Sequence, residues 1–285
     1  MSWEKLIKEN KPLVVTGTIN AYSALLAERA GIKAIYLSGG GVANASYGLP
    51  DLAMTSREDV LEDVRRIRSA SELPLLVDID TGWGSALAIS RSIKEMISAG
   101  ASGVHIEDQV SEKRCGHRPN KEIVSSEEMV DRIKAAKDAQ TDDNFLLMAR
   151  TDAFAKGGLQ EVIDRSNAFI EAGAGAIFPE AISTLKDYEE ISKNVSKPIL
   201  ANITEFGMTP LFPHNELAKA GVKIVLHPLS AFRAMSKAAE KVYATLASEG
   251  DHEGLLEKMQ TRDELYDVLD YHMYEEKIDK LFEKN

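Results

Sequence analysis

Apolar and polar positions along the chain recur in one unit. Four segments share the same order, which is a helical pattern, then Ala-Gly, then a short apolar run that ends in polar residues: 27–40, 97–109, 170–181 and 218–228. Glycine favours the left-handed conformation that ends a helix, and an apolar run of β-branched residues is typical of a buried parallel strand. A second set of apolar runs lies between these segments, at 12–18, 74–80, 145–151 and 198–204. Together the two sets predict eight strands.

Helical patterns separate most of these strands, for example at 57–70, 85–99, 126–139, 159–172 and 184–193. Eight strand–helix units in one chain of 285 residues favour an α/β fold of the (β/α)8 TIM-barrel type over a doubly wound sheet, which usually has fewer strands. Residues 251–285 are heavily charged and helical in pattern, which predicts additional C-terminal helices. No linker or shift in composition marks a second domain. We therefore expect residues 1–285 to form a single barrel domain with 251–285 as a helical extension.

Composition and charge narrow the classes of function. A hydrophobic content of 44% with 28% charged residues is that of an ordinary globular protein, and a single cysteine cannot form an intramolecular disulfide. No apolar run approaches the roughly 18 residues that span a bilayer, and the first residues lack the pattern of a secretion signal. We therefore expect a cytoplasmic protein with no membrane partner. The net charge of −11 argues against nucleic-acid binding and means that an anionic substrate needs a local cationic site.

Acidic residues gather where the predicted strands end. Asp78 and Asp80 lie two positions apart at the end of one strand, so their side chains project in the same direction. Adjacent carboxylates repel each other unless a cation lies between them, and their hard oxygen atoms suit Mg²⁺. Glu107 and Asp108 end the next strand and bring more acid to the same end of the barrel. The alternative is that one aspartate caps the following helix while the other is solvated.

The only cysteine, Cys115, lies in a long loop, 109–125, of the kind that often forms a lid. Its neighbours are cationic or can become so, which predicts a lowered thiol pKa and a role as nucleophile or as acid/base; they are Lys113, Arg114, His117 and Arg118. The alternative is a buried, inert cysteine, which is the commonest fate of a free thiol.

Two further features carry weaker signals. Three glycines after the second predicted strand, Gly39 to Gly41, can present backbone N–H groups to an anion, although a plain turn explains them equally well. Arg150, Arg233 and Arg262 can each hold a carboxylate with two parallel hydrogen bonds, but each is also explained as a surface residue. Only a shared site would change that interpretation.

In these motifs the chain resembles the isocitrate lyase/phosphoenolpyruvate mutase superfamily. The resemblance is carried by SGGGVA (38–43), VDIDTGWG (77–84) and KRCGHRPNK (113–121), and it continues through ARTDA, FPEA, NITEFG, PLSAFRAM, QTRDELY and YEEK. It implies a Mg²⁺-dependent carbon–carbon lyase that cleaves 2-methylisocitrate to pyruvate and succinate, as in the methylcitrate cycle of propionate catabolism. The alternatives are cleavage of isocitrate to glyoxylate and succinate and, from another class, a non-catalytic barrel that serves as a scaffold.

The resemblance also implies roles for individual residues. Asp78 and Asp80 bind Mg²⁺, Asp51 and Glu107 reach it through water, and Cys115 is the proton donor. The residues implied to bind the tricarboxylate substrate are Ser38, Gly39, Gly40, Cys115, Gly116, His117, Arg150, Glu180, Asn202, Thr204, Arg233 and Arg262. The base that takes the hydroxyl proton is left open between Tyr36 and an acid near the metal. The resemblance further implies a homotetramer in which the C-terminal helices pack on, or exchange with, a neighbouring subunit.

Specificity within the superfamily rests on two apolar positions. The resemblance implies that isocitrate lyases have Trp and Thr at the positions where this chain has Phe178 and Leu226. Phe and Leu together make a more open, apolar pocket that suits the extra methyl group of 2-methylisocitrate. Because one methylene contributes only about 1–3 kcal/mol of discrimination, some turnover of isocitrate is also expected.

Overall fold

The computed structural model describes residues 2–118 and 120–283. The chain divides after Phe232 into two compact units, of which the second begins at Arg233 within a long helix. The predicted division into a single barrel domain with an extension from residue 251 stays a prediction.

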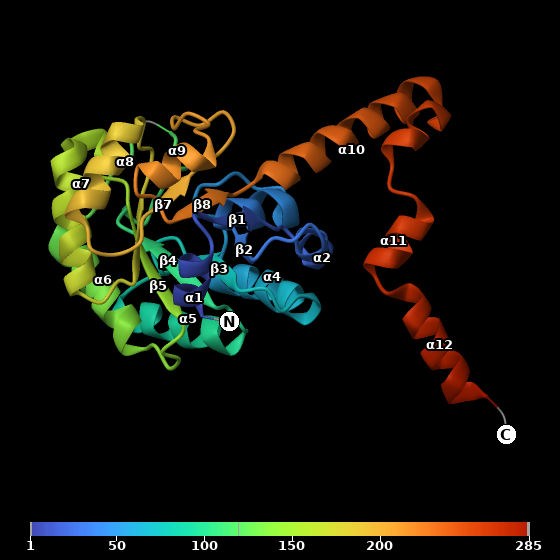
Figure 1. Cartoon of the computed structure of the whole chain (residues 1–285), viewed down its shortest axis with the longest axis horizontal. Helices are drawn as coiled ribbons and strands as arrows, with labels where there is room; N and C mark the ends of the chain where they lie inside the picture. The colour runs from blue at the N-terminus through green and yellow to red at the C-terminus, as the bar shows by residue number, and fades with distance from the viewer. Residues whose placement is uncertain (1, 119, 284–285) are drawn as a thin grey trace. The chain divides into compact units, whose positions relative to one another are not determined.

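The first unit contains eight parallel strands: β1 (Leu13–Gly17), β2 (Ala34–Leu37), β3 (Leu75–Asp78), β4 (Gly103–Glu107), β5 (Leu146–Thr151), β6 (Ala176–Pro179), β7 (Leu200–Asn202) and β8 (Ile224–His227). Their order is β6-β5-β4-β3-β2-β1-β8-β7, and one parallel bridge between Ile177 and Ile199 links β6 to β7. The strands therefore surround a barrel, as Figure 1 shows. Each observed strand lies within the segment that predicted it, so the predicted (β/α)8 fold is confirmed.

Helices cover the outside of these strands: α2 (Ala21–Arg29), α4 (Arg57–Ala70), α5 (Ala86–Ser98), α6 (Ser126–Asp138), α7 (Phe154–Glu171), α8 (Leu185–Asn194) and α9 (His214–Lys219). Local sequence sets their boundaries. Ser56 and Asp59, for example, cap α4 reciprocally, and α4 spans the predicted 57–70. The predicted helix 159–172 begins earlier than expected, because the segment from Phe154 joins it across Gly158, whose φ of 68° is non-helical.

Two apolar layers fill the unit, one between strands and helices and one inside the barrel. Helix α1 (Trp3–Glu9) contributes Trp3 and Leu6 to the inner layer, which also contains Leu146 of β5. The Trp3 indole N–H donates a hydrogen bond of 2.8 Å to the carbonyl oxygen of Ser102, just before β4. The N-terminal end of the barrel is thereby closed with apolar side chains, which leaves the C-terminal end for polar chemistry.

The second unit is helical. It comprises α10 (Ser230–Glu249), which starts in the first unit, a 3₁₀ turn at Glu253–Lys258, α11 (Arg262–Val268) and α12 (Tyr271–Phe282). Within it Tyr266 of α11 stacks on Tyr271 of α12 with ring centroids 4.2 Å apart. Helix α12 buries none of its residues and exposes Ile278, Leu281 and Phe282. The predicted C-terminal helices are confirmed, and their exchange between subunits stays a prediction.

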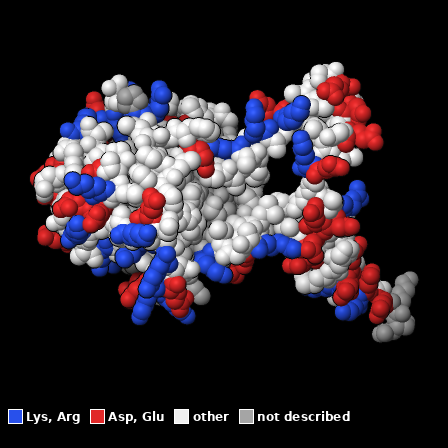
Figure 2. Space-filling view, turned by 45° about the horizontal axis from the view of Figure 1, so that its top comes forward, with Lys and Arg blue, Asp and Glu red and all other residues white. Residues whose placement is uncertain are grey.

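The surface adds two observations. Within the described residues, no helix is long and apolar enough to cross a bilayer. On the face of the first unit drawn in Figure 2, Lys and Arg side chains lie interspersed with Asp and Glu side chains, and uncharged residues cover a wide area between them.

Candidate active site

Polar side chains from five neighbouring strands converge at the C-terminal end of the barrel. Asp78 ends β3, Glu107 ends β4, Arg150 lies in β5, Glu180 follows β6, and Asn202 ends β7. All five are buried. The sequence placed Asp78 and Glu107 at this end of the barrel, and the resemblance named Arg150, Glu180 and Asn202 as substrate-binding residues. The structure brings all five together.

Asp78 is fixed by neighbours on three elements. Its Oδ2 accepts a hydrogen bond of 3.1 Å from the backbone N–H of Gly39 and one of 3.4 Å from the Tyr36 hydroxyl. Its Oδ1 accepts from the backbone N–H of Asp80 at 3.0 Å and lies 3.5 Å from Nε2 of His105. Burial opposes a charge on Asp78, but His105, Lys113 and Arg150 together lower its pKa to about 2. Asp78 is therefore an ionised carboxylate.

A lysine fills the space beside Asp80. The Lys113 Nζ lies 2.5 Å from Oδ1 of Asp80 and 2.8 Å from Oδ1 of Asp51. Burial alone would lower the pKa of Lys113, but Asp80, Glu107, Asp78 and Asp51 raise it well above the ordinary value, so the ammonium keeps its charge. Burial and the repulsion of Asp78 and Asp51 raise the pKa of Asp80 to about 6, despite the attraction of Lys113.

The donor set fits a hard divalent cation. Asp78, Asp80 and Glu107 offer carboxylate oxygens on adjacent strand ends, and Oε1 of Glu107 is buried with no hydrogen-bond partner in the described part of the chain. Burial raises the pKa of Glu107 well above its usual range, and Arg150 and Lys113 only partly offset it. Among residues 2–118 and 120–283 no three His, Cys, Asp or Glu side chains are arranged ready to hold a metal ion. The Asp78 and Asp80 assignment stays a prediction.

The glycine turn after β2 packs directly on these acids. A Cβ on Gly39 would lie 3.1 Å from Oδ1 of Asp80 and 3.2 Å from Oδ2 of Asp78, and one on Gly40 would lie 3.0 Å from Oδ2 of Asp51. The predicted anion-binding turn therefore has its Gly39 N–H committed to Asp78, and the Ser38 hydroxyl accepts from the Gly41 N–H at 3.2 Å.

Arg150 is the centre of a second charged cluster. Its Nε lies 2.9 Å from Oδ2 of Asp152 and 3.2 Å from Oε2 of Glu107, and its Nη2 lies 3.3 Å from Oε2 of Glu180. Although burial opposes the charge, these carboxylates raise the pKa of Arg150 well above its ordinary value. Asn202 donates a hydrogen bond of 3.3 Å to Oε2 of Glu180.

The loop 109–125 folds over the acids rather than away from them. The side chain of Gln109 holds both the N–H and the carbonyl of Arg114, at 3.0 and 2.9 Å. Lys121 pairs with Asp152 and donates to the Gly116 carbonyl at 2.6 Å. The sequence did not predict whether this loop lies over the site or away from it. In the structure it lies over the site.

The loop's tip contacts the substrate-binding residues named from the sequence. His117 Nε2 lies 3.4 Å from Oε1 of Glu180 and 3.4 Å from Nδ2 of Asn202, and its Nδ1 accepts from the Met208 N–H at 3.0 Å. Gly116 is required there, because a Cβ would lie 2.4 Å from Nη2 of Arg150. A Cβ on Gly207 would lie 2.7 Å from Cγ2 of Thr204 and 3.0 Å from the His117 ring, so Thr204 belongs to the same wall.

The predicted lowering of the Cys115 pKa is wrong. Burial raises the pKa of this half-buried thiol, and Asp51 and Glu180 add to the rise against a hydrogen bond from the His117 backbone and the charge of Arg150. The neighbouring cations act elsewhere: Lys113 binds the acids, while Arg114 and Arg118 are exposed. Cys115 is therefore a thiol rather than a thiolate.

Two predicted substrate-binding arginines lie in the second unit. Arg233 lies on α10, and Arg262 is the first residue of α11. Their roles stay predictions.

Sequence reasoning missed the buried His105, whose Nε2 lies 2.9 Å from the Tyr36 hydroxyl. The alternation within β4 carried the signal, because His105 and Glu107 are two positions apart and share a face. Burial lowers the pKa of His105 to about 4, so its ring is neutral. Burial and Asp78 raise the pKa of Tyr36 well above its ordinary value. Both candidates for the base, Tyr36 and an acid near the metal site, stay predictions.

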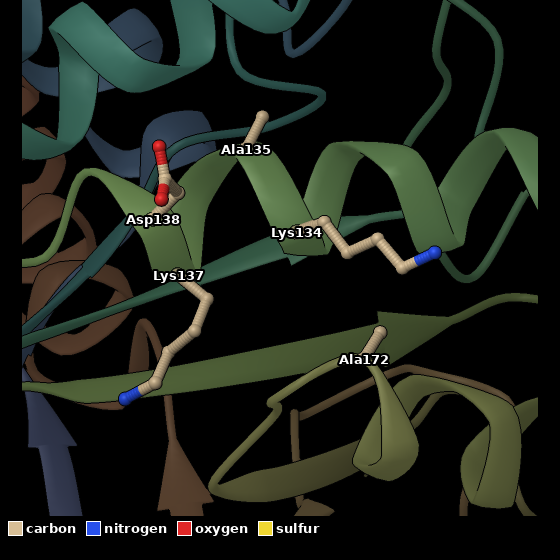
Figure 3. A pocket seen from close by; sticks show the side chains of 5 residues that line it. All are labelled: Lys134, Ala135, Lys137, Asp138 and Ala172. Carbon is tan, nitrogen blue, oxygen red and sulfur yellow. The ribbon is translucent and has the colours of Figure 1, made fainter.

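Two cavities lie away from this cluster. One has a volume of about 540 Å³ and is lined by Lys134, Ala135, Lys137, Asp138 and Ala172. Figure 3 shows these side chains, which come from α6 and from the end of α7. Another, of about 1130 Å³, lies beside α1 and includes Trp3 and Lys223 in its lining. Neither contains a residue of the predicted site, so the strand-end cluster is the candidate active site.

Comparison with known proteins shows the family of the chain. The family model for phosphoenolpyruvate phosphomutase matches residues 3–247. The chain is 57% identical over 285 residues to 2-methylisocitrate lyase of Shewanella oneidensis, covering 100% of this chain and 98% of that protein. It is 59% identical over 281 residues to 2-methylisocitrate lyase of Escherichia coli, covering 98% and 95%.

A solved structure, phosphonopyruvate hydrolase in complex with oxalate and Mg²⁺, matches with a TM-score of 0.85 and 28% identity over 98% of this chain and 97% of that one. The resemblance inferred from the sequence motifs is confirmed. The chain belongs to the phosphoenolpyruvate phosphomutase family, in which it groups with the proteins named 2-methylisocitrate lyase.

Proposed function

We propose that the protein is a carbon–carbon lyase that cleaves 2-methylisocitrate to pyruvate and succinate, a step of the methylcitrate cycle in propionate catabolism. The observation that carries the proposal is the similarity of 57–59% identity to 2-methylisocitrate lyases along almost the whole chain. The site supports it, because a protonated thiol lies in a closed loop beside a carboxylate cluster of the kind that holds Mg²⁺.

Mg²⁺ would be held by Asp78 and Asp80, with Asp51 and Glu107 reaching it through water, and it would stabilise the alkoxide of the substrate as a Lewis acid. The chain's own residues do the rest. Ser38, Gly39, Gly40, Gly116, His117, Arg150, Glu180, Asn202, Thr204, Arg233 and Arg262 bind and orient the tricarboxylate. The closed loop excludes water from the reacting carbon atoms.

Cleavage breaks the bond between C2 and C3 of the substrate. The hydroxyl proton leaves to a base, the oxygen electrons form the carbonyl of pyruvate, and the electron pair of the broken bond stays on C3 of the succinate fragment. Cys115 then gives its proton to that carbon, and the thiolate regains a proton afterwards. Its raised pKa suits this role, because a proton donor must hold its proton until the bond has broken.

The methyl group of the substrate would lie against an apolar wall. Phe178 and Leu226 are both buried inside the barrel, and the Phe178 ring lies 5.1 Å from the Arg150 guanidinium carbon and in edge contact with His105. This placement brings an apolar surface next to the carboxylate-binding cluster. It favours 2-methylisocitrate over isocitrate, and isocitrate cleavage is a side reaction.

The second unit supports a homotetramer in which C-terminal helices pack on, or exchange with, a neighbour. An isolated helix as short as α12 is marginal in water, and α12 buries none of its residues within its own chain, although Ile278, Leu281 and Phe282 are apolar. A partner subunit would cover that surface. We also place the protein in the cytoplasm, where a single cysteine stays reduced.

The substrate assignment predicts a higher kcat/KM for 2-methylisocitrate than for isocitrate, by about 10- to 100-fold, because one methyl contributes about 1–3 kcal/mol. Pyruvate or glyoxylate release is measured with each substrate in parallel. A higher kcat/KM for isocitrate would overturn the specificity, and no cleavage of either would overturn the lyase assignment.

Replacing Cys115 with Ser should lower kcat by about 10²–10⁴-fold, because a hydroxyl is a far weaker acid than a thiol. In the wild type, kcat should fall as the pH rises through the thiol's raised pKa, and this fall should be absent in Cys115→Ser. Both proteins should have the same circular dichroism spectrum. Turnover within a few-fold of the wild type would show that Cys115 is not the proton donor.

Removing divalent cations with EDTA should lower turnover by about 10²-fold or more, and Mg²⁺ should restore it, because Lewis-acid stabilisation contributes several kcal/mol. Asp78→Asn should weaken Mg²⁺ binding, measured by isothermal titration calorimetry. Asp138→Asn, on the surface of α6, is the matched control and should bind as the wild type does. Full activity in EDTA would contradict the metal assignment.

Light scattering of the wild type should give four times the chain mass of 31.3 kDa. Ile278→Asp combined with Leu281→Asp should reduce the particle mass, because charges would then lie in the proposed interface. Lys277→Ala combined with Lys280→Ala tests the polar positions of the same helix and should leave the mass unchanged. A monomeric wild type would refute the tetramer.

A further inference from the structure

Lys113 is unusual among the lysines of this chain because its ammonium is buried among acids. The residue is only 5% exposed, and its Nζ lies 2.5 Å from Oδ1 of Asp80 and 2.8 Å from Oδ1 of Asp51. Lysine is almost never buried unless it is paired. Its backbone belongs to the loop that carries Cys115, so this loop brings a positive charge to the predicted metal ligands.

We infer that Lys113 is a built-in counter-cation, which neutralises Asp51 and Asp80 in the metal-free protein and competes with the divalent cation for Asp80. The inference rests on the metal site of the proposed function. Mg²⁺ binds carboxylate oxygens at about 2.0–2.1 Å, so an ammonium on the same oxygen would lie within a few ångströms of the ion. Two such positive charges repel strongly in a buried site, and one must leave Asp80.

The competition has a consequence for the loop. Lys113 is two residues before Cys115, and Gln109 holds the intervening Arg114 through both backbone groups. Releasing the ammonium from Asp80 therefore loosens the segment from Lys113 to Cys115, while His117 and Lys121 still hold the rest of the loop against Glu180 and Asp152. Because coupling between two binding events is reciprocal, the contact between Lys113 and Asp80 weakens cation binding by the same factor by which the cation weakens that contact.

The chain offers a matched control for this idea. Lys121 is the other buried lysine of the loop, also 5% exposed, and it pairs with Asp152 rather than with a predicted metal ligand. Loss of Lys121 removes a buried ion pair and loosens the same loop, but it removes no cation from Asp51 or Asp80.

Calorimetric titration of MgCl₂ into the EDTA-treated, full-length protein separates these effects. Lys113→Met should bind Mg²⁺ about tenfold more tightly than the wild type, which is within the usual range of coupling between sites. Lys113→Gln, which is uncharged but polar, should do the same and replaces Lys113→Met if that variant does not fold. Lys121→Met should bind within about twofold of the wild type.

Trypsin cleavage of the loop gives a second readout that needs no turnover. Arg114 is exposed and is followed by Cys115, whereas Arg118 precedes a proline and resists trypsin. Mg²⁺ should accelerate cleavage of the wild type after Arg114. Lys113→Met should be cleaved rapidly without Mg²⁺ and should not respond to it.

The outcomes separate this inference from the proposed function. Equal or weaker Mg²⁺ binding by both Lys113 variants overturns the inference alone, as does a gain in affinity that Lys121→Met shares. An absence of Mg²⁺ binding by every protein overturns both the metal site and the inference. Lyase activity tested separately on the wild type reports on the proposed function, whatever Lys113 does.

Discussion

The structure depends on how an excess of buried carboxylates is balanced at the C-terminal end of the barrel. Asp78, Asp80, Glu107, Asp108, Asp152 and Glu180 are all buried there, and the buried cations are Lys113, Lys121, Arg150 and Arg165. An uncompensated buried charge costs several kcal/mol, so each acid must find a cation, a hydrogen bond or a proton. Two of the four cations come from the strands and helices of the barrel, and two come from one loop.

This balance explains why the loop lies closed. Lys113 pairs with Asp80 near the start of the loop, and Lys121 pairs with Asp152 near its end. His117, which lies between these two lysines in the sequence, contacts Glu180. Apart from the antiparallel bridge between Gln109 and Ile123, the described residues of the loop form no helix or strand, so its conformation depends strongly on these long-range contacts. The buried carboxylates of the site thus bind the loop that carries Cys115. The same ion pairs therefore balance the charge of the site and fix the position of Cys115.

The sequence predicts the barrel well and the loop poorly, for physical reasons. Short-range patterns of apolar and polar residues predict strands such as β3 and helices such as α4. Because the strands are parallel, Asp78, Glu107, Arg150 and Glu180 then lie at one end of the barrel. The direction of a side chain in a loop depends instead on residues far away in the chain. The charges around Cys115 therefore suggested a lowered pKa, although Lys113 lies on Asp80 and the two arginines lie at the surface.

The inner face of the barrel links the core to the chemistry. Tyr36 stacks on His105 with ring centroids 5.7 Å apart, and His105 meets Phe178 edge-on at 5.3 Å, so one aromatic layer forms the floor of the site. That layer holds His105 neutral and presents its nitrogen and the Tyr36 hydroxyl to Asp78. Because the same layer is apolar toward the barrel and polar toward the acids, packing fixes Asp78 as firmly as charge does. On the loop side of the site, ion pairs and hydrogen bonds, among them those from the Gln109 side chain to the backbone of Arg114, hold Cys115 in place.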